Sequence, residues 1–173
     1  MNELNQTSDK TALRIAVLAG GQSAEANVSR RSAAEIHNAL IASGHDSNVI
    51  ELDHDCVLTL LELQPDVVFP ALHGPPGEDG TIQGLLETMG LPYVGSGVRG
   101  SALAMDKVIA KSVFRTHNLP VSPERVVGAG MELKTAVAEI ESTFGNTVAI
   151  KPLNAGSAIG VQLLPEGGDL QAA

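Results

Sequence analysis

Residues 15–30, IAVLAGGQSAEANVSR, place an apolar strand pattern, a glycine pair and a helical pattern in direct succession. The β-branched run that begins at Ile15 stops at Gly20 and Gly21, and an amphipathic period starts near Val28. This order predicts a strand, a tight turn and a helix. Ligands of open parallel sheets collect beyond the carboxyl ends of the strands, so the polar loop after this first strand is a candidate site.

The next part of the chain repeats the alternation of strand and helix. Strand patterns lie at 46–53, 66–72 and 91–95, and helical patterns at 28–41, 57–63, 81–89 and 108–117. This spacing indicates right-handed β-α-β crossovers and therefore an α/β fold with an open parallel sheet and flanking helices. Pro70 has no backbone N–H and is expected to end the hydrogen bonding of the third strand.

A change of pattern marks a second domain. Pro120 and Pro123 form a linker, after which strand patterns at 125–127, 147–151 and 161–164 accompany one helical pattern at 132–144. We expect a disordered arm at 1–13, an N-terminal domain at 14–119 and a second, incomplete domain at 120–173.

Composition excludes several classes of function. The net charge of −9 and the 2% of aromatic residues disfavour nucleic acid and anionic membranes as partners, since both reward clustered Lys and Arg. The single cysteine, Cys56, allows no intrachain disulfide and no thiolate-only metal site. The polar start lacks the apolar core of a signal peptide, and no apolar run is long enough to span a membrane. A cytoplasmic location is expected.

The loop after the first strand is not a dinucleotide-binding turn, because it has two adjacent glycines and no third. A nicotinamide cofactor is therefore disfavoured. Glu25 places a carboxylate at the mouth of this loop, where it could hold an ammonium group. It could also simply favour the dipole of the following helix, and both interpretations stay open.

The loop after the third strand, His73 to Gly80, concentrates titratable groups between glycines and prolines. His73 directly follows the strand, and functional loops often have this composition. The alternative is an N-capping turn for the next helix, with Asp79 or Thr81 as the cap.

A third loop joins the last two strand patterns. Lys151 closes the first of them, and residues 154–160, NAGSAIG, are small enough for backbone N–H groups to approach a phosphate. The Ser157 hydroxyl and the lysine would add a donor and a charge. The segment lacks the Walker sequence, so it is not a P-loop. An ordinary hairpin turn is the alternative.

Taken together, four segments resemble the N-terminal half of D-alanine–D-alanine ligases of the ATP-grasp superfamily. They are GGQSAE at 20–25, ALHGPPGEDGTIQGLLETMGLPYVGSG at 71–97, SALAMDK at 101–107 and IKPLNAGSAIG at 150–160. The resemblance covers 14–164 and implies a pre-ATP-grasp domain followed by the start of an α+β ATP-grasp domain. It implies ATP-dependent joining of two D-alanines through an acyl phosphate, for peptidoglycan precursors.

The resemblance also implies roles for individual residues. Glu25 would hold the ammonium of the first D-alanine and His73 would border that pocket. Lys107, Lys151 and the loop residues Gly156 and Ser157 would bind ATP, with Ser157 also hydrogen-bonding toward Glu25 as part of the catalytic network. Ala158 departs from the family, which often has a second serine there.

The family is about twice as long as this chain. Its C-terminal part is expected to hold the ligands for Mg²⁺ or Mn²⁺, so no metal ligand is assigned here and the 173 residues are expected to be inactive alone. The family's usual assembly is a homodimer. Two alternatives remain: a ligase with another second substrate, such as lactate or serine, and a non-catalytic binding or regulatory module that kept the fold.

Overall fold

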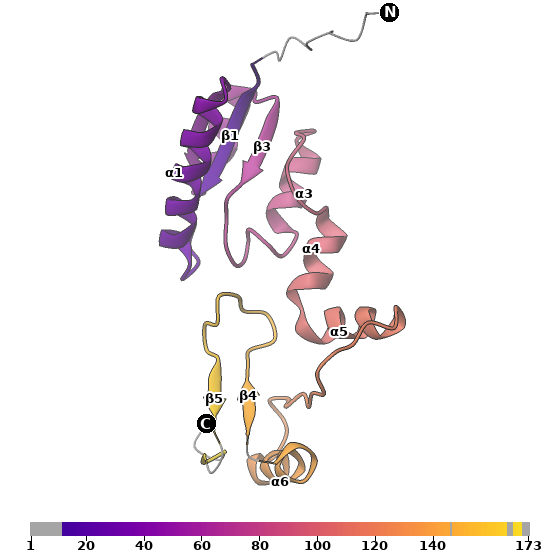
Figure 1. Cartoon of the computed structure of the whole chain (residues 1–173). Coiled ribbons are helices and arrows are strands. Elements are labelled where there is room, and N and C mark those ends of the chain that lie inside the picture. The colour runs from indigo at the N-terminus through magenta and orange to yellow at the C-terminus, as the bar shows by residue number, and fades with distance from the viewer. Residues whose placement is uncertain (1–11, 146, 166–167, 171–173) are drawn as a thin grey trace, which may run out of the picture. The chain divides into compact units, whose positions relative to one another are not determined.

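The computed structural model describes residues 12–145, 147–165 and 168–170, which form two compact units that divide between Val98 and Arg99 (Figure 1). The domain limits expected at 14–119 and 120–173 differ from this division and stay a proposal. The arm expected at 1–13 lies mostly outside the described residues.

The first unit contains a three-stranded parallel sheet with the order β2-β1-β3. Its strands are β1 (Arg14–Ala19), β2 (Asp46–Glu51) and β3 (Val67–Pro70). β1 lies in the centre and is buried from its second residue onward, which explains its continuous apolar sequence. The predicted α/β fold with an open parallel sheet is confirmed.

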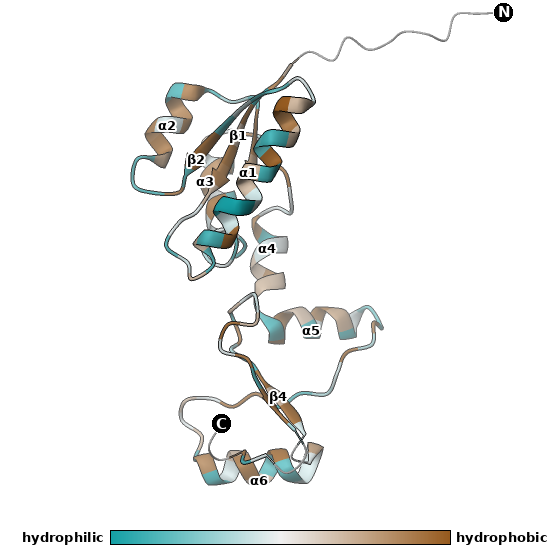
Figure 2. Cartoon of the chain, turned by 60° about the vertical axis from the view of Figure 1, so that its left-hand side comes forward, coloured by the Kyte–Doolittle hydropathy of each residue, from teal (hydrophilic) through white to brown (hydrophobic). Residues whose placement is uncertain are grey.

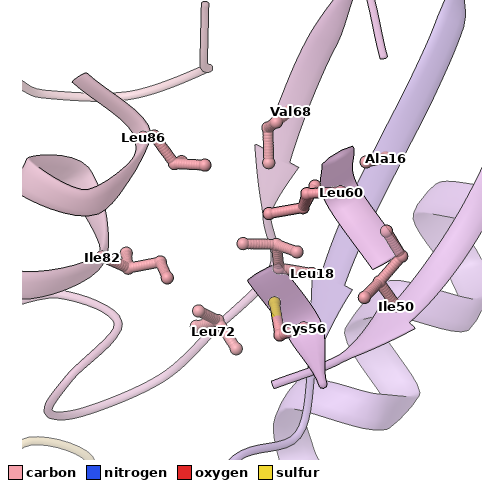
Figure 3. Packing of buried hydrophobic residues seen from close by; sticks show 9 residues of the cluster. All are labelled: Ala16, Leu18, Ile50, Cys56, Leu60, Val68, Leu72, Ile82 and Leu86. Carbon is pink, nitrogen blue, oxygen red and sulfur yellow. The ribbon is translucent and has the colours of Figure 1, made fainter. Parts of the chain in front are cut away.

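Successive residues of β1 point to opposite faces of the sheet, so two separate clusters form the core. Ile15, Val17 and Ala19 pack with residues of α1 (Ala26–Ala42) on one face. Figure 3 shows the other cluster, where Leu18 meets α2 (Cys56–Leu63) and α3 (Thr81–Thr88). The core of that face comprises Ala16, Leu18, Ile50, Cys56, Leu60, Val68, Leu72, Ile82 and Leu86.

Figure 2 shows the resulting pattern of hydropathy: the strands are hydrophobic, and the outer side of helix α1 carries hydrophilic residues. Gly44 follows α1 with φ 85°, as expected for a residue just after a helix C-cap. Cys56 is 1% exposed, and burial raises the pKa of its thiol, so this cysteine is a packing residue. Among the described residues, no helix is long and apolar enough to cross a membrane.

The expectation of a fourth strand at 91–95 was wrong. Only one bridge forms, between Val68 and Tyr93, with the Val68 N–H donating to Pro92 O at 2.8 Å and the Val94 N–H donating to Val68 O at 3.0 Å. Pro92 itself has no N–H, and β3 ends at Pro70. The ladder therefore cannot extend in either direction.

The second unit contains the rest of α4 (Val98–Met105), then α5 (Lys107–Thr116), α6 (Leu133–Phe144) and an antiparallel pair of strands. The pair consists of β4 (Val148–Ile150) and β5 (Gln162–Leu164). The strand expected at 125–127 was wrong: this segment has no regular secondary structure and pairs with no strand within the described part of the chain.

Candidate functional site

Glu25 lies at the N-cap of α1, directly beyond the carboxyl end of β1. The residue is 5% exposed, and its Oε1 atom is buried without a hydrogen-bond partner among the described residues. Burial of a carboxylate without a compensating donor is costly. The arrangement therefore suits a ligand that brings N–H donors to this oxygen.

The loop after β3 packs directly on Glu25. A Cβ atom added at Gly74 would overlap the Glu25 Oε2 atom, so only glycine fits there in the present geometry. Ser23 connects the same two loops, because its Oγ accepts from the Glu25 N–H at 3.2 Å and donates to His73 O at 2.9 Å. The structure thus brings Glu25 and His73 to one edge of the sheet, as the sequence predicted.

His73 is half-buried, and its Nε2 lies 3.3 Å from the Ser32 Oγ on α1. The acidic residues that follow have structural contacts. Glu78 closes its own loop by accepting from the Gly74 N–H at 2.8 Å, and Asp79 accepts from the Thr81 N–H at 2.9 Å where α3 begins. Gly80 is the N-cap of α3 and no side chain makes a capping hydrogen bond there, so neither Asp79 nor Thr81 is the cap that the alternative named. The His73 ring lies beside Ser32 of α1, and only its backbone O bonds to the loop that carries Glu25.

Two further groups shape this edge, and sequence reasoning gave them no role. Ser29 is fully buried and accepts from the Gly20 N–H at 2.8 Å while donating to Ala71 O at 2.7 Å. Glu51, at the end of β2, accepts from the Gly21 N–H at 3.2 Å. A carboxylate at the carboxyl end of the neighbouring strand was the available signal for Glu51.

Arg30 holds Glu51 in this position, with 2.6 Å between a guanidinium nitrogen and Oε1. Its hydrogen bond to the carboxylate lowers the pKa of Glu51 and raises the pKa of Arg30. Gly20 has φ 73°, which favours glycine, and a Cβ atom there would overlap the Glu51 carboxylate unless that side chain moved. The pair therefore supports the glycine turn that leads to Glu25.

The remaining candidates lie in the second unit. Lys107 begins α5, and its Nζ donates to Ala155 O at 2.7 Å and to Leu153 O at 3.1 Å. Lys151 follows β4 directly, is exposed and has no hydrogen bond or ion pair with another described residue. Both lysines line one cavity of about 1000 Å³, whose other walls are largely apolar side chains of α5, α6 and β4.

The connection between β4 and β5 folds into a tight turn at its tip. Ser157 and Ala158 have φ of 46° and 58°, in the left-handed region, and the Ile159 N–H donates to Gly156 O at 3.0 Å. The Ser157 side chain is exposed. Glu25 and His73 thus lie in one unit and Lys107, Lys151, Gly156 and Ser157 in the other. The expected hydrogen bond from Ser157 toward Glu25 stays a proposal.

The described residues include no group of three or more His, Cys, Asp or Glu side chains that could hold a metal ion. These residues therefore supply no ligand set that fits Mg²⁺ or Mn²⁺.

Residues 59–96 match the family model for the N-terminus of D-ala D-ala ligases. A D-alanine–D-alanine ligase of Geotalea uraniireducens is 48% identical over 160 residues, which are 92% of this chain and 50% of that protein. One from Moorella thermoacetica is 42% identical over 93% of this chain and 53% of its own length. The chain therefore spans about half the length of the curated relatives it matches.

Solved structures give the same result. The D-alanine–D-alanine ligase of Coxiella burnetii matches with a TM-score of 0.74 and 30% identity, over 86% of this chain and 55% of that one. The Bacillus anthracis ligase complexed with ATP matches with a TM-score of 0.67 and 28% identity, over 90% of this chain and 51% of that one. The similarity thus extends across most of the described residues.

Proposed function

We propose that this chain, which is similar over most of its length to the N-terminal half of D-alanine–D-alanine ligases, supplies the part of such a ligase that binds the first D-alanine and contributes to ATP binding. In the complete reaction, ATP phosphorylates the carboxylate of one D-alanine. The amine of a second D-alanine then attacks the acyl phosphate and releases phosphate. The products are D-alanyl-D-alanine, ADP and phosphate, and the dipeptide serves peptidoglycan synthesis.

The observation that carries the proposal is the Oε1 atom of Glu25, which is buried without a hydrogen-bond partner among the residues that the structure describes. The ammonium of an amino acid brings both a positive charge and three N–H donors, and hydrogen bonds between charged groups are the stronger ones. Such a ligand would offset the cost of burying the carboxylate. His73, whose backbone is tied to the Glu25 loop through Ser23, would border the same pocket.

ATP would use the second unit. Lys107 and Lys151 line the same cavity, so two cations would face a triphosphate there, while its apolar walls would suit a base. The amides of Gly156 and Ser157 would add backbone donors at the tip of the loop. The carbonyls bound by Lys107 belong to this loop, so phosphate binding and loop position would be linked.

The other parts of the proposal rest on the resemblance. Phosphoryl transfer of this kind uses Mg²⁺ or Mn²⁺ to neutralise developing charge, and the ligands of that ion are expected in the C-terminal half of the relatives. We place the reaction in the cytoplasm and expect a homodimer. Ligation to a second substrate other than D-alanine is the alternative activity, and a non-catalytic binding module is the alternative class.

Thermal unfolding with each ligand alone tests the proposal. D-alanine and ATP should each raise the Tm of the 173-residue chain, since a ligand that binds only the folded state stabilises it. L-alanine, at the same concentration, is the control and should have a smaller effect. If neither D-alanine nor ATP changes the Tm, the proposed function is wrong.

A further inference from the structure

Two serine hydroxyls connect the loop after β1 to the loop after β3 in the same way. Ser23 Oγ accepts from the Glu25 N–H and donates to His73 O. Ser29 Oγ accepts from the Gly20 N–H and donates to Ala71 O. In each case a backbone donor of the first loop and a carbonyl of the third-strand loop are joined through one oxygen atom.

This pattern uses what a hydroxyl can do and an apolar side chain cannot. A serine oxygen carries one hydrogen to donate and lone pairs to accept, so it satisfies two backbone groups at once. Ser29 is fully buried, where losing these bonds would leave both backbone groups without water as a substitute. The loops are therefore connected at two points, one at the Glu25 amide and the other at the Gly20 amide.

The separation of the two loops determines the surroundings of the Glu25 carboxylate. Its Oε2 atom occupies the space where a Cβ atom at Gly74, the residue after His73, would lie, and its Oε1 atom is buried. If the two loops moved apart, water would reach the carboxylate and the pocket for an ammonium group would lose its shape. If they moved closer, Gly74 would collide with Oε2.

We propose that Ser23 and Ser29 are positioning residues that fix the Glu25 carboxylate against the His73–Gly74 backbone and so preform the ammonium pocket. The inference rests on the proposed function, because it assigns the pocket to the ammonium of D-alanine. The two hydroxyls would hold the pocket in its binding shape before the ligand arrives and would not contact the ligand themselves.

The test compares Ser23→Ala with Ser23→Thr, since threonine keeps the hydroxyl that alanine removes. D-alanine affinity is measured by calorimetry, and amide hydrogen exchange at Glu25 and Gly20 is measured by NMR without ligand. Ser23→Ala should raise the Kd for D-alanine about tenfold, equivalent to about 1.4 kcal/mol, and should speed exchange at the Glu25 amide. Ser23→Thr should restore both. Ser43→Ala, which removes an exposed hydroxyl that donates to Ala39 O at the C-terminal end of α1, is the matched control and should change neither.

Ser29→Ala should speed exchange at the Gly20 amide. If Ser29→Ala does not fold, because Ser29 is buried, the result for Ser23→Ala decides the test. An unchanged Kd together with unchanged exchange at Glu25 in Ser23→Ala would overturn the inference. If the wild-type chain binds no D-alanine, the proposed function fails instead. The exchange rates then decide by themselves whether the hydroxyls hold Glu25 in place: faster exchange in Ser23→Ala supports the positioning, and unchanged exchange refutes it.

Discussion

At the scale of single residues, the glycines of the substrate edge are fixed by what lies beside them. Gly74 has φ 66°, and its Cα faces the Glu25 carboxylate. Gly90 has nearly the same φ, 69°, but an added Cβ there would meet no atom of the described residues within 4 Å. Alanine substitutions at the two positions therefore distinguish the cost of backbone strain, present at both, from the cost of steric overlap, present only at Gly74.

We predict that Gly74→Ala destabilises the protein more than Gly90→Ala. Each substitution places alanine in a left-handed conformation, at a cost of about 1 kcal/mol or more. Only Gly74→Ala also displaces the Glu25 carboxylate, so it alone should weaken D-alanine binding. Urea unfolding and calorimetry measure the two effects. Equal destabilisation with unaltered binding would show that the contact between Gly74 and Glu25 is absent in solution.

The ion pair between Arg30 and Glu51 predicts a dependence of stability on pH. Its guanidinium lowers the pKa of Glu51 below the ordinary value of 4.5. A lowered carboxyl pKa contributes stability above the unfolded-state pKa, and this contribution is lost as the pH falls through the folded-state pKa. The urea midpoint of wild type should therefore exceed that of Glu51→Gln at pH 7, and the gap should narrow below about pH 4.5.

Arg30→Gln is the control for this prediction, because it removes the cation and leaves the carboxylate with the Gly21 N–H. Its midpoint should be less sensitive to acid than that of wild type. The ion pair is half-exposed, so we expect a small effect that high salt reduces further. A gap between wild type and Glu51→Gln that is the same at both pH values would refute the assignment.

At the scale of elements, the start of α5 positions one of the two lysines assigned to ATP. The Asp106 carboxylate accepts from the Val108 and Ile109 N–H groups, at 2.9 and 3.0 Å, and Lys107 follows it directly. Asp55 occupies the corresponding position of α2, but its side chain makes no capping hydrogen bond. Asp106 therefore caps its helix with its side chain, whereas Asp55 occupies the same position without a capping hydrogen bond.

We predict that Asp106→Ala lowers the free energy of unfolding by about 1 kcal/mol, the usual effect of removing a helix cap. Asp106→Asn should retain most of the stability, since asparagine caps about as well as aspartate. Asp55→Ala should have a smaller effect. Chemical unfolding checks all three variants, and equal losses for Asp106→Ala and Asp55→Ala would contradict the capping role.

The elements that the sequence predicted well are those with a strong period. The first strand and the helix ending before Gly44 lie within two residues of their expected bounds, because burial and a glycine cap fix them locally. The strands expected at 91–95 and 125–127 do not form. Their β-branched residues satisfy the local pattern, but a strand also needs a partner, and no local signal reports whether one is in reach.

At the scale of the whole molecule, the sequence predicted where the substrate edge lies but not what holds it together. Parallel strands end at one edge, so Glu25 and His73 were expected to lie at the same edge, and they do. The hydroxyl bonds of Ser23 and Ser29 were not predictable, since serines near a helix N-terminus usually serve as caps. The contact between Gly74 and Glu25 depends on tertiary packing, which no spacing in the sequence encodes.

Calorimetry of D-alanine binding to Glu25→Gln tests most directly whether the Glu25 carboxylate binds the ammonium of D-alanine. Glu35→Gln is the control, because Glu35 is an exposed residue of the same helix. We predict that Glu25→Gln raises the Kd for D-alanine at least about tenfold, through loss of a charge-assisted hydrogen bond, and leaves the Kd for ATP unchanged. An unchanged affinity for D-alanine in Glu25→Gln would contradict the account.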